Sequence, residues 1–330
     1  DMCLKDLMHI WLFEVMRQKL AYNTFTSYET TYRKYVLKIG NLSALKVYDI
    51  KPLTLQRLYN DMDKMGLKKT VIPRVNRLLC AFFNYALLQG YIVKNPTYKL
   101  TIPTKKEYES SARCVAPFTN EEINLIINNA KGLYKFLFKL AFATGLRRGE
   151  LLGLKVKDLD LINNEIHVVH ALKDVKSFED SNKYVYKRVL EQPKTKSSIR
   201  IVPIPSAIIS DLKKYLNEQK EKCMSLGQPY NDECFLFTNK FGRTINSSIL
   251  QKAWIYTLEH AGVERRVFHN TRHTYATKLF EQGVPLKTVQ VLLGHANIAI
   301  TSAIYTHVMP REKEMAVDRL NFIFESGTKN

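Results

Sequence analysis

Five polar side chains between residues 147 and 305 make up a set suited to phosphoryl-transfer chemistry. In chain order they are Arg147, His269, Arg272, His295 and Tyr305. Guanidinium groups match the forked geometry of phosphate oxygens and keep their charge, so two arginines can offset the charge that builds up when a phosphodiester is attacked. A tyrosine oxygen can make that attack and then hold the phosphoryl group covalently.

A zinc site is the competing interpretation of the histidines. His269 and His273 are four residues apart, and His295 would be a third ligand. However, the residues between the first two are Asn-Thr-Arg rather than the Glu-x-x of a zinc protease, and Arg272 would repel the ion. We therefore favour a chemistry that needs neither a metal nor a nucleotide cofactor, in which fixed positive charge and positioning stabilise the transition state.

The composition limits the class of protein and its partners. A chain of 330 residues is too long for one ordinary core and suggests two domains, and a net charge of +19 favours a polyanionic partner. Nucleic acid is the first candidate. The sequence contains no run of 18 apolar residues, so we expect no membrane partner. The five cysteines are odd in number and lack CxxC spacing, which favours a reducing bacterial cytoplasm over a disulfide framework.

Residues 1–103 are predicted to form a helical DNA-binding domain. Apolar periodicity predicts helices over 4–20, 28–37, 54–62 and 75–88, with glycines at the turns. Through residue 106 there are 18 Lys and Arg against 7 Asp and Glu, so this segment carries +11 of the total charge. The alternative is that these lysines only solvate exposed helix faces.

A polar segment, residues 104–116, is predicted to link this domain to a catalytic domain over 117–310. Thr119 and Glu122 have the spacing of a helix capping box. Later segments are expected to be helical, apart from three strands near 165–170, 184–190 and 200–204. The helical segments are 133–143, 147–154, 207–222, 249–261, 271–281, 286–293 and 298–307. The expected fold class is therefore mainly α with a small antiparallel β-sheet (α+β), followed by a helical tail over 311–330.

The order and spacing of these motifs resemble the tyrosine recombinases, the integrase family that cuts and rejoins DNA at specific sites. The matching segments are Thr-Gly-Leu-Arg-Arg-Gly-Glu, His-Asn-Thr-Arg-His, Leu-Gly-His and the tyrosine ten residues later. The resemblance implies a helical core-binding domain and a catalytic domain that form a C-shaped clamp on DNA. It also implies that Arg147 and Arg272 hold the nonbridging oxygens of the scissile phosphate, and that Tyr305 forms a 3′-phosphotyrosyl link.

The resemblance gives further residues their roles. His269 would be the acid/base partner near the tyrosine, His295 would donate a hydrogen bond to the transition state, and Glu150 would support the site without reacting. A lysine in a β-hairpin over 191–203 would protonate the leaving 5′-oxygen. Lys194 aligns best with it, and Lys196 remains a competitor because a slip of two residues keeps the same face of a strand.

Within the family, the chain is most similar to integrases of Gram-positive conjugative transposons and related phages. This implies double-stranded DNA at element ends and target sites as substrate, a homotetramer on two DNA sites, and an excision factor as an accessory partner. The tail over 311–330 would dock on a neighbouring protomer, and an N-terminal arm-binding domain would precede residue 1. The alternatives are a type IB topoisomerase, which relaxes supercoils without joining two DNA segments, and a DNA-binding protein without recombination activity.

Overall fold

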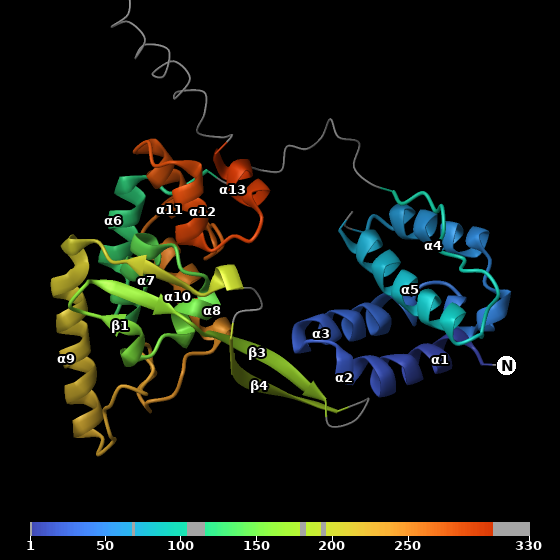
Figure 1. The fold of residues 1–330 in the computed structure, drawn as a ribbon, viewed down its shortest axis with the longest axis horizontal. Helices are drawn as coiled ribbons and strands as arrows, with labels where there is room; N and C mark the ends of the chain where they lie inside the picture. The colour runs from blue at the N-terminus through green and yellow to red at the C-terminus, as the bar shows by residue number, and fades with distance from the viewer. Residues whose placement is uncertain (1, 68–69, 104–115, 179–182, 193–195, 306–330) are drawn as a thin grey trace, which may run out of the picture. The chain divides into compact units, whose positions relative to one another are not determined.

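The computed structural model describes residues 2–67, 70–103, 116–178, 183–192 and 196–305 (Figure 1). The fold is mainly helical with a three-stranded and a two-stranded sheet, which confirms the predicted class. The chain divides into two compact units, Asp1–Cys114 with Val175–Lys187, and Val115–Asp174 with Arg188–Asn330. None of the helices in the described ranges combines the length and the apolar composition needed to span a bilayer.

The first unit is built from helices, as the sequence predicts. They are α1 (Leu4–Ile10), α2 (Arg17–Lys19), α3 (Tyr22–Thr31), α4 (Pro52–Lys64) and α5 (Val71–Leu88), with π-helical turns over Trp11–Met16 and Tyr32–Val36. The helix expected from residue 28 begins six residues earlier. Its first turns are rich in Asn, Thr, Ser and aromatic residues, whose low helix propensity hides the start from a sequence-based prediction.

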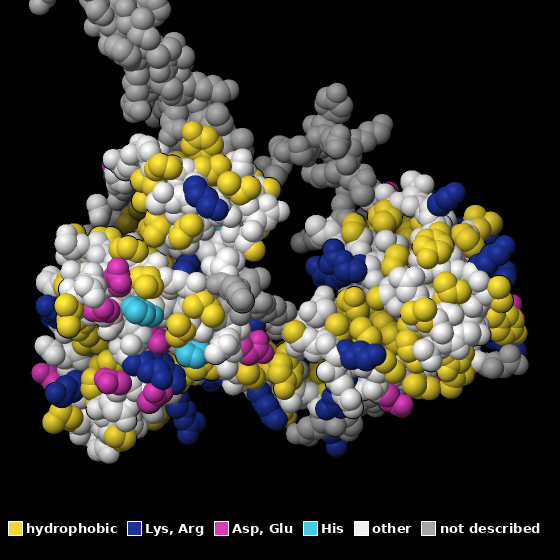
Figure 2. Space-filling view, viewed as in Figure 1, with side chains coloured by type: hydrophobic (Ala, Val, Ile, Leu, Met, Phe, Trp, Pro, Cys, Tyr) yellow, Lys and Arg dark blue, Asp and Glu magenta, His cyan; other side chains and the backbone are white. Residues whose placement is uncertain are grey.

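Aromatic side chains fill much of the first unit's core. The rings of Trp11 and Phe82 meet edge to face with centroids 5.5 Å apart. Phe178, from the strand segment that belongs to this unit, contacts Phe25 at 5.3 Å and Phe13 at 5.9 Å. Such edge-to-face contacts add to the stabilisation from apolar burial. On the face shown in Figure 2, the surface of this unit carries more Lys and Arg than Asp and Glu side chains.

In the described part of the second unit, helices α6–α10 surround the main core and helices α11–α13 form a second one. They are α6 (Asn120–Asn129), α7 (Leu133–Thr144), α8 (Arg148–Gly153), α9 (Ile209–Ser225), α10 (Ser247–His260), α11 (Asn270–Glu281), α12 (Leu286–Leu293) and α13 (Ile298–Tyr305). The predicted capping box at the start of α6 is confirmed, because the Thr119 hydroxyl accepts from the Glu122 backbone N–H at 3.2 Å and the Glu122 carboxylate accepts from that of Thr119 at 2.9 Å.

The three-stranded sheet differs from the predicted one. Its order is β1 (Leu159–Asp160), β2 (Glu165–Val168) and β5 (Arg200–Pro203), all antiparallel. The predicted strand over 184–190 is instead β4 (Tyr184–Glu191), which pairs with β3 (Ala171–Phe178) in the second sheet. The prediction that 191–203 forms a hairpin is therefore wrong, because its flanking strands belong to different sheets.

A small second core joins α11, α12 and α13 (Figure 1). Its buried apolar side chains are Ala276, Phe280, Val289, Leu293 and Ile304. Because these side chains come from all three helices, the packing determines how the polar ends of the helices lie relative to one another. The sequence motifs that carry Arg272, His295 and Tyr305 all lie on this group of helices.

Candidate active site

Arg147 lies at a corner between two helices. Helix α7 ends at Gly145, whose φ of +60° is a left-handed conformation that favours glycine, and Arg147 is the extended residue directly before α8. The ring of Tyr275 lies where a side chain at position 145 would be, with Cγ 2.9 Å from an ideal Cβ. Position 145 therefore needs glycine both for its backbone conformation and for its packing.

Glu150 holds Arg147 from the first turn of α8. Its carboxylate accepts from the Arg147 backbone N–H at 2.8 Å and from the Arg147 Nη1 at 2.7 Å. The same carboxylate accepts from Arg200 Nη2 at 2.9 Å and Nη1 at 3.1 Å. Burial raises the pKa of the Glu150 carboxyl, but the hydrogen bonds and charge of Arg200, together with the charge of Arg147, outweigh burial and hold this pKa below its ordinary value.

Arg272 is almost completely buried in the first turn of α11, with 2% of its surface exposed. Its Nη1 donates to the carbonyl of Gly145 at 2.8 Å, and its Nη2 donates to the carbonyl of Leu293. Burial lowers the pKa of Arg272 to about 9, and the charge of Arg147 contributes in the same direction. The group is still protonated at neutral pH, so it brings a desolvated positive charge to the site.

The C-terminal end of α12 connects the arginines. Gly294 caps the helix with φ of +64°, and the backbone N–H of His295 donates to the carbonyl of Gln290 at 3.2 Å. The last three carbonyls before His295 each accept from a different arginine: Leu292 from Arg200 Nε at 2.6 Å, Leu293 from Arg272 Nη2, and Gly294 from Arg147 Nη2 at 3.0 Å. The negative end of the helix is thus covered by three guanidinium groups.

His295 follows this terminus directly. Its Nδ1 lies 2.9 Å from the hydroxyl of Thr301, and its carbonyl accepts from the Gln290 side chain at 2.9 Å. Burial, together with the charges of Arg272 and Arg147, lowers the pKa of His295 to about 4. A neutral imidazole at pH 7 can donate a hydrogen bond from one nitrogen while the other contacts the threonine.

His269 lies directly before α11, on the turn that also presents Arg272. Partial desolvation lowers its pKa, followed by the charges of Arg272, His273 and Arg147. The imidazole is exposed at the surface, where these neighbouring positive charges disfavour its protonated form. A histidine whose pKa is lowered in this way is neutral at pH 7 and can accept a proton.

Tyr305 is the last residue that the structure describes. Its half-buried ring packs edge to face on Phe280, with centroids 5.0 Å apart, at the opposite end of α11 from Arg272. Tyr275, by contrast, is a partly buried phenol close enough to Arg200 and Arg272 for their charges to oppose the rise in its pKa that burial causes. The structure therefore brings Arg147, Glu150, Arg272 and the His295 turn together, and it places Tyr305 by its contact with Phe280.

Two predicted residues are not placed by the structure. Lys194 lies outside the described residues, and Lys196 begins a 3₁₀ turn, Lys196–Ser198, without a described side chain. Arg200, in contrast, is central to the site and was not singled out from the sequence. The signal was its register. Arg200 pairs with Val168 and lies on the same face of β5 as the buried Val202, so a charged residue occupies an inward position of this strand.

Known proteins match both parts of this chain. A family model of the phage integrase family matches residues 117–312, and a model of its N-terminal SAM-like domain matches residues 3–62. The chain is 46% identical over 330 residues to the tyrosine recombinase XerC-like protein of Caldanaerobacter subterraneus subsp. tengcongensis, which covers 98% of this chain and 84% of that protein. The chain belongs to the phage integrase family of tyrosine recombinases. It is therefore an enzyme that cleaves and rejoins DNA.

Other relatives of this tyrosine recombinase include an integrase of a mobile element. The ICEBs1 integrase of Bacillus subtilis is 26% identical over 295 residues, which is 88% of this chain and 76% of that protein. The Tn1549 transposon integrase in complex with circular intermediate DNA has a TM-score of 0.71 at 23% identity, covering 97% of this chain and 100% of that one. A λ integrase dimer bound to a core site has a TM-score of 0.62 at 18% identity. At these identities the structures show a shared fold.

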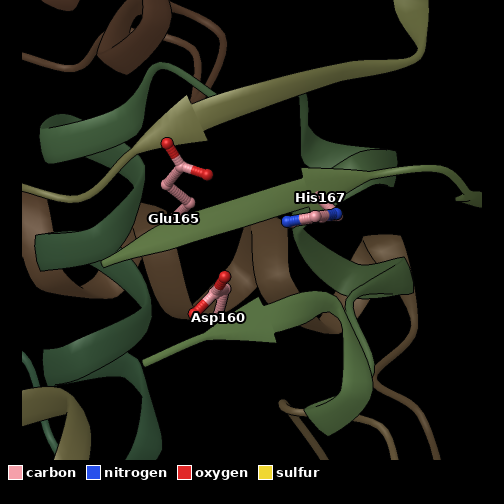
Figure 3. Close-up of side chains that lie close together, drawn as sticks. All are labelled: Asp160, Glu165 and His167. Atoms are coloured by element: carbon pink, nitrogen blue, oxygen red, sulfur yellow. The ribbon is translucent and has the colours of Figure 1, made fainter. Parts of the chain in front are cut away.

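The described residues of the recombinase also include one group of side chains close enough to share a metal ion. Asp160, Glu165 and His167 lie together on β1 and β2 (Figure 3). One Asp160 oxygen already accepts from the backbone N–H groups of Ile162 and Asn163, each at 2.9 Å. Acidic groups at a surface often lie together without an ion, so we assign no metal to this group.

Proposed function

We propose that this recombinase is the integrase of a mobile element and acts on double-stranded DNA at the element's ends and at target sites. The observation that carries the proposal is the shared anchoring of Arg147 and Arg272, which donate to the successive carbonyls of Gly294 and Leu293 directly before His295. Two guanidinium groups anchored to one turn, together with the imidazole that follows that turn, provide the donors that a scissile phosphate needs. The mobile-element assignment is supported by the likeness to the ICEBs1 and Tn1549 integrases.

The proposed reaction uses each side chain at a stated atom. The Tyr305 oxygen attacks the phosphorus and gives up its proton to His269, while the bond from phosphorus to the 5′-oxygen breaks. Arg147 and Arg272 neutralise the nonbridging oxygens, and His295 donates a hydrogen bond to one of them. Lys194 protonates the leaving 5′-oxygen, with Lys196 as the alternative.

The products of this step are a 3′-phosphotyrosyl link and a free 5′-hydroxyl. A 5′-hydroxyl from a second DNA segment then gives its proton to the now neutral lysine and attacks the same phosphorus, and the tyrosine oxygen leaves with the proton returned by His269. Each exchange replaces one phosphodiester by another through the covalent intermediate. The protein contributes positioning and fixed positive charge to the catalysis. Because its proposed substrate is DNA, we propose that the enzyme acts in the bacterial cytoplasm.

A nicked suicide substrate tests the proposed nucleophile. We expect a duplex made from the joined ends of the element, nicked beside the cleavage site, to trap the wild-type chain covalently. Tyr305→Phe should abolish trapping and leave DNA affinity unchanged, since the phenol oxygen is the attacking atom. Trapped protein is measured by denaturing gel, and affinity by filter binding.

Tyr275→Phe is the matched control, because it removes a phenol close enough to Arg200 and Arg272 for their charges to act on it. Trapping that survives in Tyr305→Phe and disappears in Tyr275→Phe would refute the assignment of the nucleophile. Covalent trapping and supercoil relaxation without joining of two different duplexes would instead favour a topoisomerase.

We further propose that the enzyme assembles as a tetramer on two DNA sites and that its tail, which lies outside the described residues, docks on a neighbouring protomer. Deleting residues 312–330 should then reduce tetramer formation on DNA and impair or deregulate cleavage. Light scattering of the DNA complex, together with suicide-substrate trapping, measures both effects. Unchanged assembly and unchanged strand exchange would reject the role of the tail. Whether an excision factor assists the enzyme is tested separately in the same assay.

A further inference from the structure

Arg200 differs from the other two arginines of the site in how its guanidinium group is used. Arg147 has 35% of its side chain exposed, whereas Arg200 has 4% exposed. Arg200 also uses every nitrogen of its guanidinium group: Nε donates to Leu292, Nη2 to Glu150, and Nη1 to both Glu150 and the carbonyl of Ser198 at 3.3 Å. The described hydrogen bonds of Arg147 and Arg272 use only Nη1 and Nη2, so Arg200 is the guanidinium of the three that is least available to a substrate phosphate.

We propose that Arg200 is a positioning residue for the recombination reaction, which holds the Arg147 guanidinium through Glu150 and seats the turn of His295 through the Leu292 carbonyl. The proposal rests on the proposed function for its catalytic meaning. Its geometry stands on the described contacts alone. Arg200 acts on the reacting phosphate only through other residues.

The charges explain why the site needs this third arginine. Arg147, Arg200 and Arg272 bring three positive charges and Glu150 brings one negative charge, so the group has a formal charge of +2. Without Arg200, the Glu150 carboxylate would pair with Arg147 alone and would compete with the phosphate for it. Because buried charges interact strongly, the fork between Arg200 and Glu150 leaves Arg147 free to serve both the carboxylate and a substrate.

Packing supports the same role. An ideal Cβ at Gly294 would lie 2.9 Å from Arg200 Cδ and 2.9 Å from the carbonyl oxygen of Ser197. The helix terminus therefore rests directly on the Arg200 stem and on the turn before β5. A change in the length or planarity of the Arg200 side chain must move this terminus, and the terminus carries both the Gly294 acceptor of Arg147 and the His295 ring.

Arg266 is a matched control within the same unit. Its side chain is 8% exposed and forms a fork with Glu122, whose Oε2 lies 2.9 Å from Nη1. It also lies over the ring of Phe118 at 4.4 Å. Arg266→Lys therefore removes a buried fork between arginine and glutamate, as Arg200→Lys does, but the fork it removes is not the one that holds Arg147.

The first experiment does not depend on enzymatic activity. In ¹⁵N NMR spectra of arginine side chains, the Arg147 signal is assigned by its loss in Arg147→Lys. We expect Arg200→Lys to shift or broaden this signal and Arg266→Lys to leave it unchanged. An Arg147 signal that is unchanged in Arg200→Lys would overturn the proposal. If that variant does not fold, Gly294→Ala replaces it, because the added Cβ would press on Arg200 Cδ. The same change of the Arg147 signal is then expected, and an unchanged signal would again overturn the proposal.

The second experiment measures single-turnover cleavage of the nicked duplex at saturating DNA. A displacement near 1 Å at a catalytic group costs on the order of a hundredfold in rate, so we expect a loss of about that size in Arg200→Lys with DNA affinity unchanged. Equal losses in Arg200→Lys and Arg266→Lys would mean that Arg200 is only structural. A wild-type chain that never becomes linked to DNA would refute the proposed function, and the NMR comparison would still decide the positioning role.

Discussion

The buried arginines of the site are each matched to acceptors on the protein. Removing a charge from water costs several kcal/mol, and Arg272, with 2% of its surface exposed, has two backbone carbonyls as partners. Burial still lowers its pKa to about 9. This guanidinium is thus already desolvated in the folded protein, and no further desolvation is needed when a phosphate binds. A preorganised site stabilises a transition state in this way.

The lowered pKa of His295 predicts a stability change at acidic pH. Burial lowers this pKa from 6.5 to about 4, so between these values the unfolded chain binds a proton that the folded chain does not. The free energy of unfolding therefore decreases as the pH falls from about 6.5 toward 4. We expect His295→Gln to gain stability relative to wild type over that window, as measured by urea unfolding at pH 7 and pH 4.5.

His260→Gln is the control for this experiment, because His260 is an exposed residue at the end of α10. Comparing the two variants separates the effect of the His295 environment from the effect of removing one histidine from the chain. His269 titrates in the same direction as His295, so only the difference between the His295 variant and wild type isolates one group. A constant difference between His295→Gln and wild type across the window would contradict the assignment.

The residues of the site were predictable to different degrees. Arg147, His269, Arg272 and His295 stand in short motifs whose types and spacing indicate phosphate chemistry, so the sequence alone was enough to single them out. Arg200 stands in no such motif, and its importance follows from a register that pairs β5 with β2. That pairing joins segments more than 30 residues apart, which local periodicity cannot reveal.

At the scale of elements, the corner between α7 and α8 connects packing to the site. Gly145 ends α7 in a left-handed conformation, its carbonyl accepts from Arg272, and Tyr275 of α11 fills the space beside its Cα. One residue thus sets where α8 begins and where the Arg272 guanidinium lies. The direction of α8 in turn places Glu150 beside Arg147.

Gly145→Ala is expected to destabilise the chain beyond the cost of its backbone conformation. A left-handed alanine costs about 1–2 kcal/mol, and the contact with the Tyr275 ring adds about 1–3 kcal/mol of overpacking. Gly262→Ala is the control, since Gly262 has φ of +65° and no atom within 4 Å of an added Cβ. Thermal and urea unfolding give both values; equal losses in the two variants would show that Tyr275 does not restrict position 145.

Element types were easier to predict from the sequence than element partners. The helices of both units follow from apolar periodicity and from caps such as Thr119, and their bounds differ from the prediction by a few residues at most positions. The strand over 184–190 was found, but its partner was not, because Tyr184–Glu191 is largely exposed and lacks the alternation that would match it to a buried strand. Pairing in a two-stranded sheet is determined by tertiary contacts as much as by local sequence.

At the scale of the whole molecule, charge is distributed unevenly along the chain. The first 106 residues carry +11 and the remaining 224 carry +8, so the smaller segment has the denser positive charge. The face in Figure 2 shows basic side chains over the first unit with few acidic ones between them. Neutralising phosphates with such residues releases counterions, which makes affinity depend steeply on salt.

This charge predicts the salt dependence of DNA binding. For B-DNA, log affinity falls with log salt concentration at a slope of about −0.9 per neutralised phosphate. Arg74 and Arg77 are exposed three residues apart on α5, and Arg74→Gln with Arg77→Gln should make the slope shallower by about 1.8 if both contact phosphate. The control is Lys213→Gln with Lys214→Gln on α9, which changes the net charge equally and should leave the slope unchanged. Fluorescence anisotropy from 50 to 300 mM salt measures both slopes, and equal shifts would mean that the binding responds to total charge alone.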